Sequence, residues 1–341
     1  MNRPLAVTVI LAALMSLSAC AAAPPTVPTE VADPLVLSLG TDDHPGDPAA
    51  AEIQEFVKQV AALSGGTIII EPVWHAGGDV ADWDQAIARL AIEGDLDLAL
   101  VPSRAWDELG VDSLRPLNTP FLIDSDDLVE AVIGGDLAQR LMSGLNGSGV
   151  EGMALWPEGL RHPFGYDAPL VAPADFQGAR IRAATSRTVA QTFAALGAQT
   201  DDQEPNRYVH AGTESSFLLK AGGTATANIT FFPKVAVLVG NDEALQKLDS
   251  GQRHVLEQAA DATRDWAVLS LPDELAAASA FCDDGGSILQ ARPEDVAALV
   301  VATAGVRSDI AADPGGAETI AEIEHLKRRF PAFVAPECAN P

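Results

Sequence analysis

The stretch TIIIEPVWHAGGDVADWDQAIARLAIEGDLDLALVPS, residues 67–103, decides the fold because it reads as strand, helix, strand. An apolar run over 67–73 predicts one strand, the segment 82–94 predicts a helix, and the run over 96–103 predicts a second strand. This alternation is typical of a parallel sheet with crossover helices. Ligands of such sheets bind at the carboxyl ends of the strands, so we expect the functional site in the loops there.

The neighbouring segments extend this pattern in both directions. Upstream, the apolar run over 35–40 predicts a strand, and apolar residues from Ile53 to Leu63 recur at helical spacing until Gly65 and Gly66 end the helix. Downstream, the sequence predicts helices over 125–149, 186–199, 241–270, 293–311 and 318–330, and strands over 150–156, 179–184, 234–241 and 286–291.

Length and charge limit the classes of function. A chain of 341 residues exceeds the size at which a single core usually stops growing, so two lobes are expected. Hydrophobic residues make up 48% and charged residues 20%, which is an ordinary globular balance. The formal net charge of −27 argues against nucleic acid and against an anionic membrane surface as partners, because both require positive patches.

The first twenty residues predict export. Arg3 precedes an apolar run from Leu5 to Leu17, which is too short to span a bilayer comfortably and fits a signal peptide. The residues just before Cys20 resemble the bacterial lipoprotein signal, in which this cysteine is lipidated and becomes the mature N-terminus. The alternative is a secretory peptide that is cut near Ala23.

The lipoprotein interpretation gives a signal peptide over 1–19 and a lipid-anchored tether over 20–34, rich in Ala, Pro and Thr. No later run is long and apolar enough to span a bilayer. We therefore expect an extracytoplasmic protein that is held at the membrane only by its N-terminal lipid.

The two remaining cysteines predict a disulfide. With Cys20 lipidated, Cys282 and Cys338 form a pair in an oxidising compartment, and their bond would tie back the C-terminal tail. They have neither CxxC spacing nor clustered histidines, so they are poor metal ligands. We expect no metal and no cofactor.

Three common catalytic motifs are missing from the sequence. GxSxG, HExxH and P-loop patterns are missing, and the six histidines are scattered. The protein is therefore not expected to be an enzyme, although sites can be assembled from distant residues.

A positive window stands out in this acidic chain. Residues 156–190 contain four arginines against three acidic residues, and Arg182 lies at the end of the short strand ARIRAA, just before a helix that opens at Thr185–Ser186. A guanidinium offers two parallel donors, and a helix N-terminus offers free N–H groups, so the two together predict an anion site. The alternative is that Arg182 pairs with an acidic residue elsewhere in the chain.

The order of segments over roughly 35–270 resembles the solute-binding proteins of TRAP-type (tripartite ATP-independent periplasmic) transporters. LSGGTIIIEPVWHAGG is similar to the family's sGG-x-v-x-v-x-p segment, and AIEGDLDLALVPS to its G-x-lDia strand. LNTPFLIDSDD is similar to its lPFl element, LWPEGLRHPFG to w-x-x-G-x-R, and ADFQGARIRAATSRTVAQTFAALGAQ to dlkGlkiRvp…ALGA.

The resemblance implies an α/β, two-lobed periplasmic-binding-protein-like fold with a mixed β-sheet in each lobe and a ligand cleft between them. It places lobe I at 35–157 plus 234–275 and lobe II at 158–233 plus 276–341. It also implies a monomeric receptor that captures a small carboxylate-bearing solute, an organic acid, and delivers it to a TRAP-type membrane permease. The alternatives are a ligand-binding lipoprotein that signals without transport, and an exported hydrolase or lyase.

The resemblance also suggests ligand-binding residues. Arg182 matches the arginine of the kiR strand, which meets the ligand's carboxylate, and Arg161 matches the arginine of w-x-x-G-x-R, with a loop salt bridge as its alternative. The family's segment with a ligand-facing asparagine is missing, and Asn228 is the candidate to fill a similar space. His75 stands in an altered turn, as ligand donor or turn residue. Trp74, like Trp83 and Trp106, either stacks on the ligand or packs within a lobe.

Overall fold

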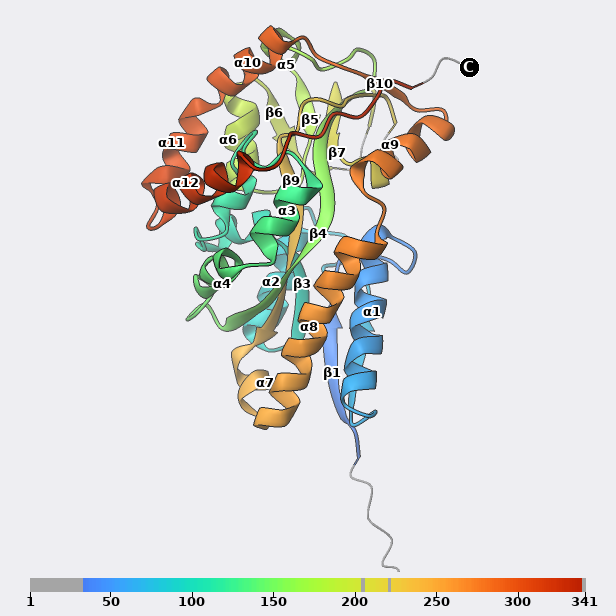
Figure 1. The fold of residues 1–341 in the computed structure, drawn as a ribbon, viewed down its shortest axis with the longest axis vertical. Coiled ribbons are helices and arrows are strands. Elements are labelled where there is room, and N and C mark those ends of the chain that lie inside the picture. Colours follow the sequence, from blue (N-terminus) through green and yellow to red (C-terminus); the bar gives the residue numbers. More distant parts are fainter. Residues whose placement is uncertain (1–32, 204–205, 220–221, 339–341) are drawn as a thin grey trace, which may run out of the picture. The chain divides into compact units, whose positions relative to one another are not determined.

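The computed structural model describes residues 33–203, 206–219 and 222–338. The expected signal peptide, Cys20 with its lipid, and all of the expected tether except its last two residues lie outside these ranges. Figure 1 shows the described body as a long sheet with helices packed on both of its faces. The α/β fold class predicted from the pattern of strands and helices is confirmed.

The first half of the sheet has the strand order β2-β1-β3-β9-β4. Strands β1, β2 and β3 are parallel and are joined by the crossover helices α1 and α2, whereas β9 is antiparallel to β3 and to β4. The predicted strand–helix–strand pattern of this region is therefore correct. The bounds are β1 Leu35–Gly40, α1 Pro48–Leu63, β2 Ile68–Val73, α2 Trp83–Glu93, β3 Leu98–Pro102, β4 Val150–Gly165 and β9 Phe232–Asn241.

The second half of the sheet starts from the last residues of β4. These residues pair antiparallel with β7 and β8; β7 continues in parallel to β5 and β6, and β8 pairs with β10. Since β4 belongs to both halves, it connects the two lobes directly. The bounds are β5 Arg180–Arg182, β6 Gln199–Asp201, β7 Gly212–Ser215, β8 Thr224–Thr226 and β10 Ser287–Leu289.

Strand β4 is longer than the predicted strand over 150–156. Its pairing with β9 shifts register between Pro157 and Leu160 and then continues, so the segment after Pro157, Glu158 and Gly159, makes a bulge within the strand instead of ending it. Proline cannot donate to the ladder, and Gly159 has a φ of 84°, which favours glycine, so both residues suit a bulge. The expected lobe boundary at 157/158 falls at this bulge.

The remaining helices cover the sheet. The predicted segments 125–149, 241–270 and 293–311 are each divided into two helices, and α5 and α9 were not predicted. The bounds are α3 Asp126–Ile133, α4 Asp136–Ser143, α5 Pro173–Phe176, α6 Arg187–Ala195, α7 Asp242–Gln246, α8 Ser250–Ser270, α9 Glu274–Asp283, α10 Pro293–Ala302, α11 Ala304–Ala312 and α12 Gly316–Lys327, with 3-10 helices at η1 Ser103–Leu109, η2 Arg115–Asn118 and η3 Phe217–Leu219.

Strand β9 shows how the first half of the sheet is buried on both faces. Ala236 and Leu238 face a core that α1 and α8 cover, whereas Val237 and its alternate neighbours face a second core beneath α2, α3 and α4. The strand therefore reads as a continuous apolar run, because neither of its faces meets water. In the first core the rings of Phe56 and Trp156 lie 5.6 Å apart.

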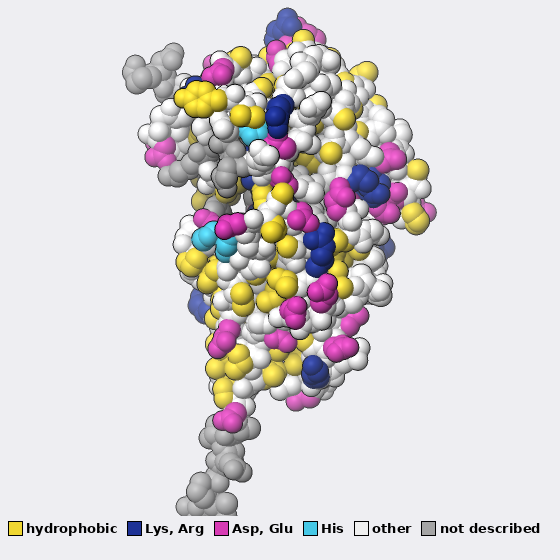
Figure 2. Space-filling view, turned by 180° about the vertical axis from the view of Figure 1, so that it is seen from behind, with side chains coloured by type: hydrophobic (Ala, Val, Ile, Leu, Met, Phe, Trp, Pro, Cys, Tyr) yellow, Lys and Arg dark blue, Asp and Glu magenta, His cyan; other side chains and the backbone are white. Residues whose placement is uncertain are grey.

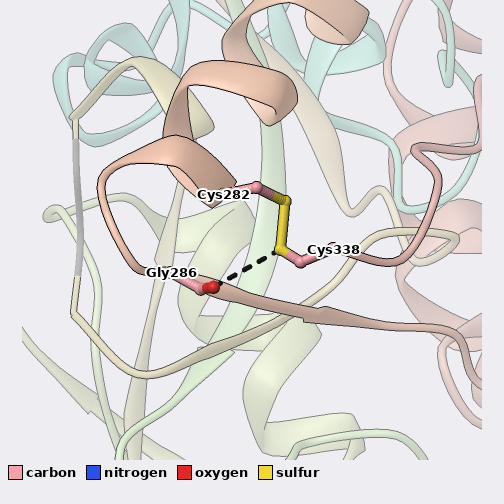
Figure 3. Close-up of a disulfide and its surroundings, with 3 residues drawn as sticks. All are labelled: Cys282, Gly286 and Cys338. Atoms are coloured by element: carbon pink, nitrogen blue, oxygen red, sulfur yellow. Dashed lines mark hydrogen bonds between the residues drawn. A yellow bond between two sulfur atoms is a disulfide. The ribbon is translucent and has the colours of Figure 1, made fainter. Parts of the chain in front are cut away.

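The predicted disulfide between Cys282 and Cys338 is present (Figure 3). It joins the end of α9 to the C-terminal tail, with the two Cα atoms 5.4 Å apart. The sulfur of Cys338 lies 3.4 Å from the carbonyl oxygen of Gly286, just before β10. The bond therefore fastens the tail to the second half of the sheet.

Charged side chains are interspersed on the face shown in Figure 2, where Asp and Glu alternate with Lys and Arg and form no single acidic patch. Many of them form exposed pairs, such as Arg207 with Asp167. None of the helices in the described ranges has the length and apolar character needed to cross a membrane.

Candidate functional site

A cavity of about 150 Å³ lies at the carboxyl ends of β1 and β3 and is lined by residues from both halves of the sheet. This is the position that the strand pattern predicts for a ligand. A larger hollow of about 680 Å³ lies beside α4 and α8, and another of about 700 Å³ lies beside α3 and α8, but neither is lined by the carboxyl end of a strand. The charged residues lining the cavity are Asp42, Asp43, Asp84, Glu158, Glu214, Arg104, Arg161, Arg182 and Lys234.

Arg182 ends β5 and lines the cavity, because Ile181 before it is buried in the core beneath the strand. Its Nε is buried and has no hydrogen-bond partner, and among the described residues no carboxylate forms an ion pair with it. Its guanidinium lies over the ring of Trp83, 5.4 Å from the centroid. The arginine is thus held against an aromatic side chain with its charge unpaired.

The two neighbouring arginines are engaged elsewhere. Arg180 pairs with Asp201 at 2.5 Å, and Arg187 pairs with Asp112; both arginines are largely exposed. Of the three arginines in this segment, Arg182 alone lines the cavity.

The N-terminus of α6 is not free for an anion, so this part of the predicted site is wrong. The buried carboxylate of Asp107 accepts hydrogen bonds from the Ser186 hydroxyl at 2.9 Å and from the backbone N–H groups of Arg187 and Thr188 at 3.1 and 2.8 Å. An anion of the protein itself therefore occupies the positive end of this helix. The available positive charge is that of Arg182.

Arg161 lies on β4 just after the bulge and is buried beside the cavity. Its Nε is 3.7 Å from Oε2 of Glu214, and neither atom has a hydrogen-bond partner. Burial lowers the pKa of Arg161, and the charge of Glu214 opposes that shift. The fold thus brings Arg161 and Arg182 to one cavity, but Arg161 already has a carboxylate nearby.

The two other cations of the cavity are paired more closely. Arg104 binds Asp84 at 2.9 Å, with both side chains buried, and Lys234 binds Glu158. Sequence reasoning did not select these four residues. No motif marks them, because each pair is formed between separate elements that only the fold brings together.

The opposite wall of the cavity is acidic. Asp42 and Asp43 follow β1, and the hydroxyl of Thr41 donates to Asp43 at 2.7 Å. Oδ1 of Asp42 is buried without a hydrogen bond, 3.5 Å from Nδ1 of His75. Burial, and then the charges of Asp84 and Asp43, raise the pKa of Asp42 to about 6.

A further carboxyl lies behind this wall. Glu52 on α1 is fully buried, and neither of its oxygens has a hydrogen-bond partner. Burial, reinforced by the charge of Glu158, raises its pKa well above the usual value. Acidic groups are therefore crowded on this side of the cavity, and burial disfavours the charged form of Glu52.

Of the other residues predicted to contact a ligand, only Trp83 lines the cavity. The side-chain amide of Asn228 donates to and accepts from the backbone of Ala291, at 2.8 Å each, so its polar atoms are already engaged. His75 contacts Asp42 from behind, and Trp74 packs against the core of the first half-sheet. Trp83 lines the cavity, whereas Trp106 is fully buried in the core.

Comparisons with known proteins agree with this architecture. Residues 39–207 match the DctP family, described as bacterial extracellular solute-binding protein, family 7. The chain is 29% identical over 165 residues to the uncharacterized protein y4mM of Sinorhizobium fredii, and 26% identical over 198 residues to the C4-dicarboxylate-binding periplasmic protein DctP of Vibrio cholerae. These matches cover 48% and 58% of this chain, but the chain spans only 30% and 57% of those relatives' lengths.

Solved structures share the fold over nearly their whole length. A TRAP periplasmic solute-binding protein from Ralstonia eutropha superposes with a TM-score of 0.76 at 18% identity, covering 86% of this chain and 99% of that chain. One from Shewanella oneidensis gives 0.72 at 17% identity, with 86% and 99% covered. These proteins are two-lobed solute-binding proteins and not enzymes, in agreement with the sequence expectation. Residues 39–207 thus match the family 7 bacterial extracellular solute-binding proteins, the DctP family, and the described body has the fold of the TRAP periplasmic solute-binding proteins.

Proposed function

We propose that the protein is an extracytoplasmic receptor that captures a small carboxylate-bearing solute between its two lobes. The observation that carries this proposal is the unpaired guanidinium of Arg182 in a cavity whose other cations have carboxylate neighbours. A planar guanidinium offers two parallel donors that match a carboxylate, and a water-poor site strengthens the pair.

The ligands of solved relatives support an organic acid. The Ralstonia eutropha protein was solved with bound (S)-2-acetolactate, the Shewanella oneidensis protein with succinate, and a Roseobacter denitrificans protein with β-D-glucuronate. All three ligands carry a carboxylate. In our proposal Arg182 binds this group, and Arg161 supports it from the floor of the cavity.

Capture requires the lobes to close, and the crossing segments suit a hinge. The bulge of β4 lies at the proposed boundary 157/158, opposite the boundary 233/234 on β9, and the turn after α8 just precedes the boundary 275/276, which falls in the first turn of α9. Glu274, which begins α9, accepts from the backbone N–H of Leu160 at 2.8 Å, lies 3.3 Å from the buried ring of His162, and donates its own N–H to Asp126 at 2.8 Å. Glu274 thus holds the crossing segments together, and closure would bend the chain around this point.

The proposal extends to delivery and location. We propose that the filled receptor docks on a TRAP-type membrane permease, and that a lipid on Cys20 keeps it at the membrane. Uptake of the ligand into vesicles that contain the permease subunits encoded beside this protein tests delivery. Uptake that requires the receptor is expected; a neighbouring sensor kinase and no uptake would favour signalling.

A thermal-shift screen of organic acids, amino acids and sugars on the purified protein tests ligand capture. A ligand at a hundredfold excess over its Kd should stabilise the protein by about 2.7 kcal/mol. Hits among carboxylates are expected. If only neutral compounds stabilised the protein, the carboxylate proposal would fail, and turnover of a hit would indicate an enzyme instead.

A further inference from the structure

The charges of the cavity do not balance once its pairs are formed. Arg104 is paired with Asp84, Lys234 with Glu158, and Arg161 lies beside Glu214. Among the cavity's charged residues this leaves three groups: the cation of Arg182 and the two carboxylates of Asp42 and Asp43.

These three groups lie on different walls. Arg182 comes from β5 in the second half of the sheet, whereas Asp42 and Asp43 follow β1 in the first half. A small molecule between the walls therefore meets one positive and one negative surface. The small volume of about 150 Å³ brings both surfaces within reach of the same ligand.

Three kinds of organic acid should bind in this cavity with different affinities. A dicarboxylate would place its second charge near Asp42 and Asp43, with no cation there left to receive it. A hydroxyl group could donate to those carboxylates but would leave their mutual repulsion in place. An ammonium group would both donate and neutralise, and a hydrogen bond between charged partners is the stronger kind.

We infer that the cavity selects a zwitterion, a small molecule whose carboxylate binds Arg182 and whose ammonium group binds Asp42 and Asp43. This inference rests on the proposed capture of a carboxylate and adds the chemical class of the other end of the ligand. It separates this chain from its relatives whose names state that they bind C4-dicarboxylates.

Three acids with the same four-carbon chain test the inference by isothermal titration calorimetry: 4-aminobutanoate, 4-hydroxybutanoate and succinate, which differ only at the far end. Equivalent triads built on the best hit of a screen of amino acids, hydroxy acids and dicarboxylates extend the test to other lengths. The ammonium member of the best-binding triad is expected to bind at least about tenfold more tightly than the hydroxyl member, and the dicarboxylate most weakly.

Variants assign the effect to the acidic wall. D42N should weaken zwitterion binding by about 10- to 100-fold and leave the hydroxy acid nearly unchanged. D79N is the matched control, because Asp79 contacts the same histidine, His75, but is fully exposed and does not line the cavity. If D42N fails to fold, as judged by circular dichroism, D43N replaces it.

The possible outcomes separate this inference from the function on which it rests. The zwitterion inference fails if hydroxy acids or dicarboxylates bind most tightly. It also fails if the wild type and D42N, or D43N in its place, bind the zwitterion equally well. Either outcome leaves the proposed carboxylate receptor intact. Binding of no acid of any class would overturn both.

Discussion

The two walls of the cavity differ in the sign of the charge that each presents to a ligand. On the wall formed by the second half of the sheet, the arginines flanking Arg182 in sequence have acidic partners, and Arg182 itself does not. On the wall formed by the loop after β1, Asp42 and Asp43 are crowded with other acids. A charge without a partner in the cavity can form a charge-assisted hydrogen bond with a ligand, so Arg182 and the acidic wall mark where electrostatic binding energy is available.

The largest effect is expected at Arg182. R182A removes the positive wall and should cost about 2–5 kcal/mol of binding free energy, roughly 30-fold to several-thousand-fold in Kd. R182K should also weaken binding, because the planar fork is lost. R180A is the matched control, since Arg180 stands two residues earlier on β5, pairs with Asp201 and does not line the cavity. Equal affinity of R182A and R180A for the ligand would contradict the assignment.

The helix next to Arg182 gives the second effect, on stability. D107A removes a buried carboxylate that accepts three hydrogen bonds at the start of α6, so the free energy of unfolding should fall by about 2–3 kcal/mol. Chemical denaturation measures this loss. Ligand affinity should stay close to wild type; tighter binding of the acid would mean that the helix N-terminus serves as an anion site after all.

The third effect is a pH dependence set by the acidic wall. Asp42 has its pKa raised to about 6, so lowering the pH from 7 to 5 protonates it and removes the charge that the ammonium group needs. Zwitterion affinity should therefore fall by about tenfold over this range, as the ionised fraction of such a group does. Besides Asp42, the groups facing this point are Asp43, Asp84 on α2, His75 after β2 and Lys234 on β9.

D42N provides the control for this profile. The slope should flatten in the variant, because the carboxyl group that titrates in this range has been removed. An unchanged pH profile of zwitterion affinity in D42N would show that Asp42 does not interact with the ligand's ammonium group.

The smallest effect on ligand affinity is expected at Trp83, which contacts Arg182. W83L removes the ring on which the guanidinium of Arg182 rests, so the arginine is less well oriented before binding. Cation–π contacts of this kind contribute about 0.5–2 kcal/mol, and the Kd should rise accordingly. An effect as large as that of R182A would mean that Trp83 itself contacts the ligand.

The sequence predicted those parts of the molecule that local patterns determine. The alternation over 67–103 was sufficient for the parallel strands and their crossover helices, and the two cysteines left after Cys20 were sufficient for the disulfide. The extension of β4 was not predictable, because Pro157 and Gly159 usually interrupt a strand, and only pairing with β9 turns them into a bulge.

The candidate site likewise combines residues that the sequence could predict with residues that only the fold reveals. Arg182 could be selected from its position at a strand end and from the family resemblance. The hydrogen bonds of Asp107 at the start of α6 and of Asn228 with Ala291 could not be predicted, because the bonded residues lie 79 and 63 positions apart in the chain. Asp42 and Asp43 were uninformative in so acidic a sequence and become significant only when the fold places them opposite an unpaired arginine.

The most direct test of the central claim is a crystal structure of the protein with the ligand that the screen identifies. The account predicts a carboxylate oxygen within about 2.7–3.2 Å of the Arg182 guanidinium, with the ligand's cationic group on the side of Asp42 and Asp43. A bound ligand whose carboxylate makes no contact with Arg182 would contradict it.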